Sequence, residues 1–134
     1  SDVYKRQGVE IDRSTAVVVA TMHKQDHKFL KIALDGGAWY IGLIASEKRA
    51  GIVLETLSKM GVAGEELARI RTPAGIDIGG ETPAEIALSI LAEIVALARG
   101  GSGGYLRETK KMREELADVL SDSIGGAERV NPVC

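Results

Sequence analysis

The chain has 134 residues, of which 45% are hydrophobic and 27% are charged, with a formal net charge of -2. This length is typical of about one domain with a real core, and the near-neutral charge gives no basis for binding nucleic acid or an anionic membrane. A single cysteine, Cys134, excludes an internal disulfide, and no apolar run reaches the roughly 18 residues of a membrane span. The composition therefore predicts a cytoplasmic protein without nucleic-acid or membrane partners.

The first seven residues, SDVYKRQ, show no periodicity and join abruptly to the rest of the chain. Residues 1–7 are therefore interpreted as a non-native leader, and the domain is predicted to cover residues 8–99. It begins with a β-branched run at residues 15–21. The lack of polar alternation in this run is typical of a strand buried on both faces of a parallel sheet.

A polar loop separates this strand from a short helix predicted at about residues 27–34, which ends at Gly36 and Gly37. His23 and His27 are four residues apart, but no third metal ligand of suitable spacing is present, so a solvated loop is the favoured interpretation. His23 is kept as a candidate ligand contact, because open α/β sheets bind ligands at the carboxyl ends of their strands.

Residues 38–44 form a second candidate for a buried strand, and a helix is predicted from there to a stop at Gly61. The inner side of this helix is expected to carry Val53, Leu54, Leu57 and Met60. A short helix at residues 65–70 and a third strand at residues 75–78 complete the alternation. Alternating strands and helices predict a parallel α/β sheet with right-handed crossovers.

The clearest helix starts after Thr82, which can cap it, with Pro83 at the first helical position and Glu85 completing a capping box. Its polar stripe is narrow and consists of Glu85, Ser89 and Glu93, each four residues apart. The inward apolar residues are expected to be Ile86, Ile90, Ile94 and Leu97, with Ala87 and Leu91 beside them. A helix that is apolar around most of its circumference is interpreted as a core or interface helix.

Asp77 lies between Ile76 and Ile78, a polar residue in an apolar context. Two interpretations stay open. The carboxylate can hydrogen-bond the glycine turn at residues 79–80, or it can face a ligand at a strand end.

Ser46, Lys48 and Arg49 form a second candidate site at the start of the helix that ends near Gly61. Two cations in a first helical turn oppose the helix dipole by ~0.3–1 kcal/mol each unless an anion compensates them, and Glu47 offsets part of this cost. A helix N-terminus that comes after a parallel strand is a plausible anion site. The alternative is that these residues are solvated surface charges.

Residues 100–134 are predicted to form a Gly-rich linker at 100–104, a charged surface helix, and a frayed tail after Ile124. The apolar side of this helix is expected to comprise Tyr105, Leu106, Met112, Leu116, Val119 and Leu120. Surface packing and contact with a partner are the two interpretations, and surface packing is favoured.

The stretch GIDIGGETPAEIALSILAEI at residues 75–94 resembles the C-terminal signature of the xanthine dehydrogenase accessory factor (XdhC/CoxI) family. The resemblance covers about residues 13–99 and implies the later half of a Rossmann-like domain. The fold class is therefore predicted as α/β, a partial Rossmann-like parallel sheet with flanking helices and an appended C-terminal helix. The chain looks truncated at its N-terminus.

The resemblance also implies a function, since the family assists the maturation of molybdenum hydroxylases in the cytoplasm. It implies a module that binds or delivers the molybdopterin cofactor, with the hydroxylase apoenzyme as partner. A sulfur-donating desulfurase and a homodimer are further candidates. A family run similar to Y-I-G-x-x-G-S-R-R-K is matched by Tyr40, Ile41, Gly42, Ser46, and Lys48 or Arg49. The sequence departs from this run at Ala45 and Glu47, which weighs against phosphate binding. The cofactor-binding residues expected are Gly42, Ser46, Lys48, Arg49, Asp77 and His23.

No G-x-G-x-x-G turn comes after the first strand, so binding of NAD is not expected for this chain. No nucleophile arrangement is visible, which favours a non-catalytic accessory protein. The alternatives are a fragment of a nucleotide-dependent oxidoreductase or transferase that lacks its glycine-rich half, and a fragment with no activity.

Overall fold

The computed structural model describes residues 10–20 and 25–124. Three parallel strands form one sheet in the order β1 (Ala16–Val19), β2 (Tyr40–Leu43) and β3 (Ile70–Arg71). Val17 pairs with Ile41, and Ile41 pairs with Ile70. Sequential parallel strands need a crossover between each pair, and helices supply both of them here. The predicted α/β class with a partial Rossmann-like parallel sheet is confirmed.

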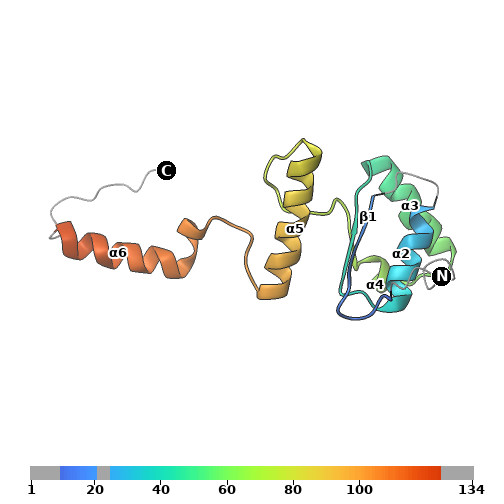
Figure 1. Ribbon diagram of the computed structural model, residues 1–134, viewed down its shortest axis with the longest axis horizontal. Helices are drawn as coiled ribbons and strands as arrows, with labels where there is room; N and C mark the ends of the chain where they lie inside the picture. Colours follow the sequence, from blue (N-terminus) through green and yellow to red (C-terminus); the bar gives the residue numbers. More distant parts are fainter. Residues whose placement is uncertain (1–9, 21–24, 125–134) are drawn as a thin grey trace.

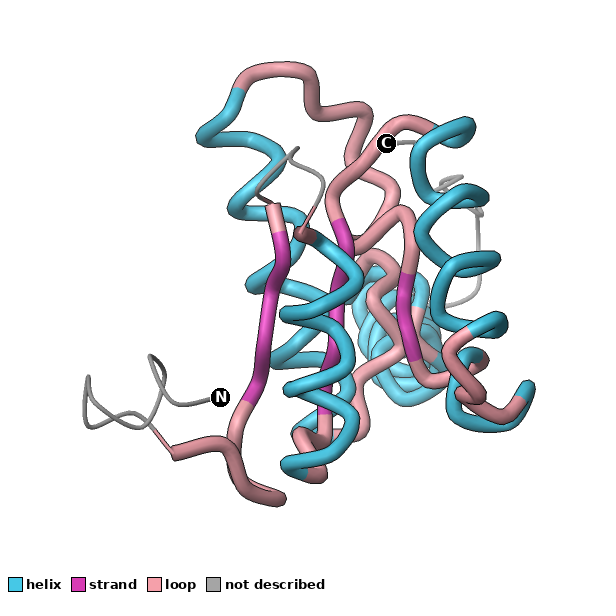
Figure 2. The backbone as a smooth tube through the Cα atoms, turned by 90° about the vertical axis from the view of Figure 1, so that its right-hand side faces the viewer, coloured by secondary structure: helices cyan, strands magenta, loops and turns pink. Residues whose placement is uncertain are grey.

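The helices lie on both faces of the sheet (Figure 1). Helix α2 (Asp26–Gly36) connects β1 to β2, while α3 (Glu47–Lys59) and the single turn α4 (Gly64–Leu67) connect β2 to β3. Helices α2 and α3 pack against each other on one face, and α5 (Pro83–Arg99) lies on the opposite face. Figure 2 shows the strands side by side with α2 running along them.

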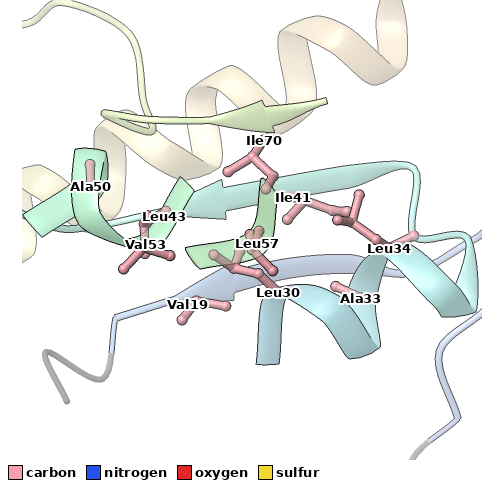
Figure 3. Packing of buried hydrophobic residues seen from close by; sticks show 11 residues of the cluster. Val19, Leu30, Ala33, Leu34, Ile41, Leu43, Ala50, Val53, Leu57 and Ile70 are labelled. Carbon is pink, nitrogen blue, oxygen red and sulfur yellow. The ribbon is translucent and has the colours of Figure 1, made fainter. Parts of the chain in front are cut away.

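The main core lies between the sheet and helices α2 and α3 (Figure 3). Its buried side chains are Val19, Leu30, Ala33, Leu34, Ala38, Ile41, Leu43, Ala50, Val53, Leu57 and Ile70. The predicted inner positions of α3 are confirmed at Val53 and Leu57, and Leu54 packs against the cluster. Met60 was expected to face inward and is instead 48% exposed, because it occupies the C-cap, where the helix has already ended.

The two longer strands differ in burial. All four residues of β2 are buried, as predicted. The prediction that the first strand is buried on both faces is wrong, because Ala16 and Val18 are exposed. Glu93 of α5 reaches Tyr40 of β2 and Arg71 of β3, so this helix covers the second face of the sheet beside those strands.

The third strand lies earlier than predicted. Residues 70–71 form β3, and the helix expected at residues 65–70 is the single turn α4. Residues 75–78 form a loop rather than a strand, because Gly75 has a φ of 110°. The N–H groups of Gly75 and Ile76 bind α5 and not a neighbouring strand.

Helix α5 begins as predicted. Thr82 is the N-cap, Pro83 is the next residue, and the capping box between Thr82 and Glu85 is complete. The expected burial is wrong, since only Ser89 and Ile90 of this helix are buried. Ile86 and Ile94 are half-buried, whereas Ala87, Leu91 and Leu97 are exposed. The apolar circumference of α5 is therefore not explained by the core of this chain.

The C-terminal region comprises the short 3-10 turn η1 (Leu106–Glu108) and helix α6 (Lys110–Ile124), which extends away from the sheet (Figure 1). The six residues expected on its apolar side are all exposed, so the favoured surface packing on the domain does not occur. The leader at residues 1–7 and the tail after Ile124 lie outside the described residues. None of the described helices combines the length and apolar character needed to cross a membrane.

Candidate ligand pocket

The narrow polar stripe of α5 binds the backbone of residues 73–80, here called the 73–80 loop. A carboxylate oxygen of Glu93 accepts a hydrogen bond from the Gly75 N–H at 3.1 Å. One turn earlier, the Ser89 hydroxyl donates to the Ile76 carbonyl at 2.7 Å, and the Ile76 N–H donates to the Ser89 carbonyl at 3.2 Å. The polar stripe therefore faces the protein interior and fixes the loop on the helix.

The first residue of the stripe, Glu85, binds the backbone that comes directly after the 73–80 loop. Its carboxylate accepts hydrogen bonds from the N–H groups of Glu81 and Thr82, both at 3.0 Å. These bonds lower the pKa of the Glu85 carboxyl. Besides its part in the capping box, Glu85 closes the turn that leads out of the 73–80 loop through its bond to Glu81.

Glu93 also joins the helix to the sheet. The buried Tyr40 hydroxyl donates to the Glu93 carboxylate at 2.6 Å, and the Arg71 guanidinium lies 3.4 Å from its second oxygen. Burial, together with the hydrogen bond to Glu93, raises the pKa of the Tyr40 phenol well above its usual range. Tyr40 therefore stays neutral and remains a donor, which couples β2 to the same carboxylate that holds Gly75.

Three glycines let the backbone approach closely enough for these bonds. A Cβ on Gly75 would collide with the Ser89 hydroxyl, and one on Gly80 would lie 2.9 Å from the Cβ of Glu85. A Cβ on Gly42 would lie 2.9 Å from the Cβ of Ala74. Gly42, expected as a cofactor contact, thus has a packing reason of its own, because it admits the start of the loop against β2.

An open pocket of about 420 Å³ lies between the carboxyl end of β2 and the 73–80 loop. It is lined by Ile44, Ala45, Pro73, Ala74, Gly75, Ile76, Asp77, Ile78, Gly79, Gly80, Ile86 and Ser89. Its volume is within the range of small-molecule sites, and its position is the edge at which open α/β sheets bind ligands. The lining is mainly isoleucine side chains and loop backbone, and Asp77 is the one charged residue in it.

Asp77 combines the two interpretations that the sequence leaves open. One carboxylate oxygen accepts a hydrogen bond from the Gly79 N–H at 3.3 Å, which stabilises the glycine turn. The second oxygen makes no hydrogen bond with the residues that the structure describes, and the side chain is exposed at the pocket. Asp77 can therefore support the loop and still accept a hydrogen bond from a ligand.

The Ser46–Arg49 turn lies next to the pocket, since Ala45 lines the pocket and α3 begins at Glu47. The Ser46 hydroxyl accepts from the Arg49 N–H at 3.2 Å and so acts as the N-cap. Arg49 is bound to Asp26, with 3.1 Å between the guanidinium Nε and the carboxylate. The anion that compensates Arg49 is thus a side chain of this protein, whereas Lys48 is exposed and makes no ion pair within residues 10–20 and 25–124.

Asp26 lies between the two histidines weighed above as metal ligands, but the sequence patterns did not indicate its ion pair with Arg49. Its side chain is fully buried at the start of α2, and its second oxygen, Oδ1, has no hydrogen-bond partner among the described residues. A sequence signal for the pair does exist, since Asp26 and Arg49 each lie in the first turn of a helix that comes after a parallel strand, and such helix starts meet at one sheet edge. His23 lies outside the described residues. Within the described ranges, no three His, Cys, Asp or Glu side chains come together as a metal site.

Comparison with known proteins identifies a family whose members this chain resembles in sequence. The model of the XdhC Rossmann domain matches residues 2–94. The Escherichia coli protein YqeB is 36% identical over 100 residues, which cover 75% of this chain and 18% of that protein. The E. coli molybdenum cofactor insertion chaperone PaoD is 29% identical over 89 residues, covering 66% of this chain and 28% of that protein.

A probable xanthine dehydrogenase subunit from Bacillus subtilis is 35% identical over 81 residues, which cover 60% of this chain and 22% of that protein. Among solved structures, a xanthine dehydrogenase from Bacillus halodurans has the same fold, with a TM-score of 0.59 and 23% identity. That match covers 84% of this chain and 30% of the other chain. The chain thus spans less than a third of the length of each of these proteins.

Proposed function

Because the chain belongs to the XdhC family, we propose that it is part of an accessory protein for the maturation of molybdenum hydroxylases. Its pocket receives the molybdopterin cofactor as cargo for delivery to the apoenzyme. The similarity to PaoD, a molybdenum cofactor insertion chaperone, supports this role. The observation that carries the proposal is the pocket itself, since the family signature at residues 75–94 builds both its loop and the helix that holds the loop.

The lining fits the ring system of such a cofactor. Ile44, Ile76 and Ile86 supply apolar surface for a planar heterocycle. The outer edge of a pterin carries N–H and amino groups, which need acceptors, and the exposed Asp77 carboxylate is an acceptor with one oxygen available. A charge-assisted hydrogen bond from the ring edge to Asp77 would fix the orientation of the ring.

The Ser46–Arg49 turn fits the phosphate only in part. The free N–H groups at the start of α3 and the exposed Lys48 ammonium favour an anion there. Arg49 is assigned to Asp26 instead, and Glu47 adds negative charge beside Lys48. We therefore place the ring on Asp77, the phosphate on Lys48 and the helix N-terminus, and Arg49 in a supporting role. A contact from His23 stays a prediction.

Anaerobic titration of the 134-residue chain with molybdopterin tests this proposal. Asp77→Asn should weaken binding about ten-fold or more, because a hydrogen bond to a charged group contributes about 1.5–3 kcal/mol. Lys48→Ala should weaken binding by a similar factor at low salt and less at high salt, because the site is exposed. The matched controls on α6 are Asp118→Asn and Lys111→Ala, which should bind like the unaltered chain.

Equal affinities for Asp77→Asn and Asp118→Asn would remove Asp77 from the site. NAD serves as a second ligand in the same titration, and no binding is expected. Micromolar affinity for NAD would favour the alternative of a nucleotide-dependent oxidoreductase. The apoenzyme of a molybdenum hydroxylase remains the proposed partner, and a sulfur-donating desulfurase remains a prediction.

A further inference from the structure

One side of α5 is apolar and exposed. Leu88, Leu91 and Val95 are 61%, 60% and 54% exposed, and they succeed one another at helical spacing. The exposed alanines Ala84, Ala87 and Ala98 flank them, so no charge interrupts this surface, here called the α5 outer face. The polar side chains of the same helix, Glu85, Ser89 and Glu93, make hydrogen bonds within the domain. A contiguous apolar surface of this kind marks an interaction site.

Helix α6 carries a second apolar surface, formed by Met112, Leu116, Val119 and Leu120 at a spacing of four, three and one residues. Each of these side chains is at least 37% exposed, and most of the other positions of the helix are charged residues or serines. The two helices are similar in length, with 17 residues in α5 and 15 in α6. At about 1.5 Å per residue, each could cover nearly the whole of the other.

The linker at residues 100–104 determines which surfaces α6 can contact. After α5 ends, Gly101 lies against Ala96 and Gly103 lies near the Ile76 side chain, so residues 100–104 turn back along the helix toward the 73–80 loop. From there α6 points away from the domain (Figure 1). In this arrangement α6 contacts η1 and leaves the α5 outer face of its own chain uncovered.

We propose that α6 packs on the α5 outer face of a second copy of this chain, and that the second copy returns the contact. Each chain carries both the α5 outer face and the apolar surface of α6. Two copies related by a two-fold axis would therefore cover both apolar surfaces in each copy, as in other helix exchanges. The charge-free α5 outer face suits the apolar side of α6, whose charges would stay at the rim. This surface is separate from the pocket and does not depend on the proposed ligand.

The oligomeric state of the full 134-residue chain tests the exchange. Sedimentation equilibrium should give twice the chain mass of 14.2 kDa. Leu91→Glu with Val95→Glu on α5, and Leu116→Glu with Val119→Glu on α6, should each weaken the dimer about a hundred-fold or more, because central apolar contacts dominate such interfaces. Ile52→Glu on α3, where Ile52 is 55% exposed, is the control and should leave the dimer intact. Circular dichroism checks that each variant is folded.

Mixing the two double variants distinguishes packing of α6 on the α5 of a second copy from packing of α6 on the α5 of its own chain. The α5 variant has an intact α6, and the α6 variant has an intact α5, so an equimolar mixture should form a heterodimer through one remaining contact. Packing within a chain predicts that the mixture stays monomeric. An unaltered chain that is monomeric at roughly 100 μM, or a dimer that both double variants leave intact, would overturn the proposal and assign the α5 outer face to another partner.

Discussion

Replacing Arg49 with alanine is expected to destabilise the chain by about 3 kcal/mol, the lower end of the range for breaking a buried ion pair. The lower end applies because the Arg49 side chain is 31% exposed, whereas the carboxylate of Asp26 is fully buried. Without the guanidinium, the buried carboxylate of Asp26 would lose its ion pair, and neither of its oxygens would have a partner among the described residues. The midpoint of urea denaturation, monitored by circular dichroism, measures the effect.

Lys48→Ala is the matched control, since Lys48 is the adjacent residue and is exposed without an ion pair among the described residues. Its free energy of unfolding should change by no more than about 0.5 kcal/mol. The double variant Asp26→Asn with Arg49→Ala should recover part of the loss, because no buried charge then remains. Equal denaturation midpoints for Arg49→Ala and Lys48→Ala would show that the ion pair does not support the fold.

Gly75→Ala is expected to cost about 2–4 kcal/mol, through the strain of a positive φ and the added collision. The φ of Gly75 is 110°, and its new Cβ would meet the Ser89 hydroxyl, which also binds the Ile76 carbonyl. The start of the 73–80 loop would have to leave α5, so the variant should also lose binding at the pocket. Thermal unfolding and the molybdopterin titration measure the two effects separately.

Gly79→Ala is the control for Gly75→Ala. Gly79 also has a positive φ, of 67°, but an added Cβ would meet no atom within 4 Å. It should therefore lose only the cost of the left-handed conformation, about 1–2 kcal/mol. Equal losses in the two variants would mean that contact with Ser89 is unimportant for the loop.

The fold could be predicted from the sequence wherever a local pattern decides it. The apolar runs at residues 15–21 and 38–44 indicated two strands, and Thr82, Pro83 and Glu85 indicated the start of α5. The third strand could not be found in this way, because two residues carry no periodicity and β3 exists through its pairing with β2. The exposed side of β1 was missed for a similar reason, since burial depends on what covers the neighbouring face.

The polar stripe of α5 shows a second limit of prediction from the sequence. Its spacing is visible in the sequence, and a narrow polar stripe is usually interpreted as the solvent side. Here Ser89 and Glu93 face inward, because the 73–80 loop presents N–H and carbonyl groups that an apolar helix face could not satisfy. Such a partner becomes apparent only once the loop is known to lie on the helix.

In the candidate site, too, the sequence indicated individual residues but not their partners. Asp77 was identified from its apolar neighbours, and it lines the pocket. Arg49 was identified as a cation that lacks compensation, and its partner, Asp26, is 23 residues away in the sequence. Short-range spacing indicates which residues are unusual, whereas their partners come from the crossovers that bring α2 and α3 together.

Binding of molybdopterin at the 73–80 loop is tested most directly by an anaerobic ¹H–¹⁵N NMR titration of the full chain. The largest shifts are expected at the amides of Ala45, Ile76 and Gly79, which line the pocket, and at Lys48 beside it. The amides of α6 should be unaffected by the ligand. Saturable shifts that leave residues 73–80 unchanged and fall elsewhere in the chain would contradict the proposed pocket.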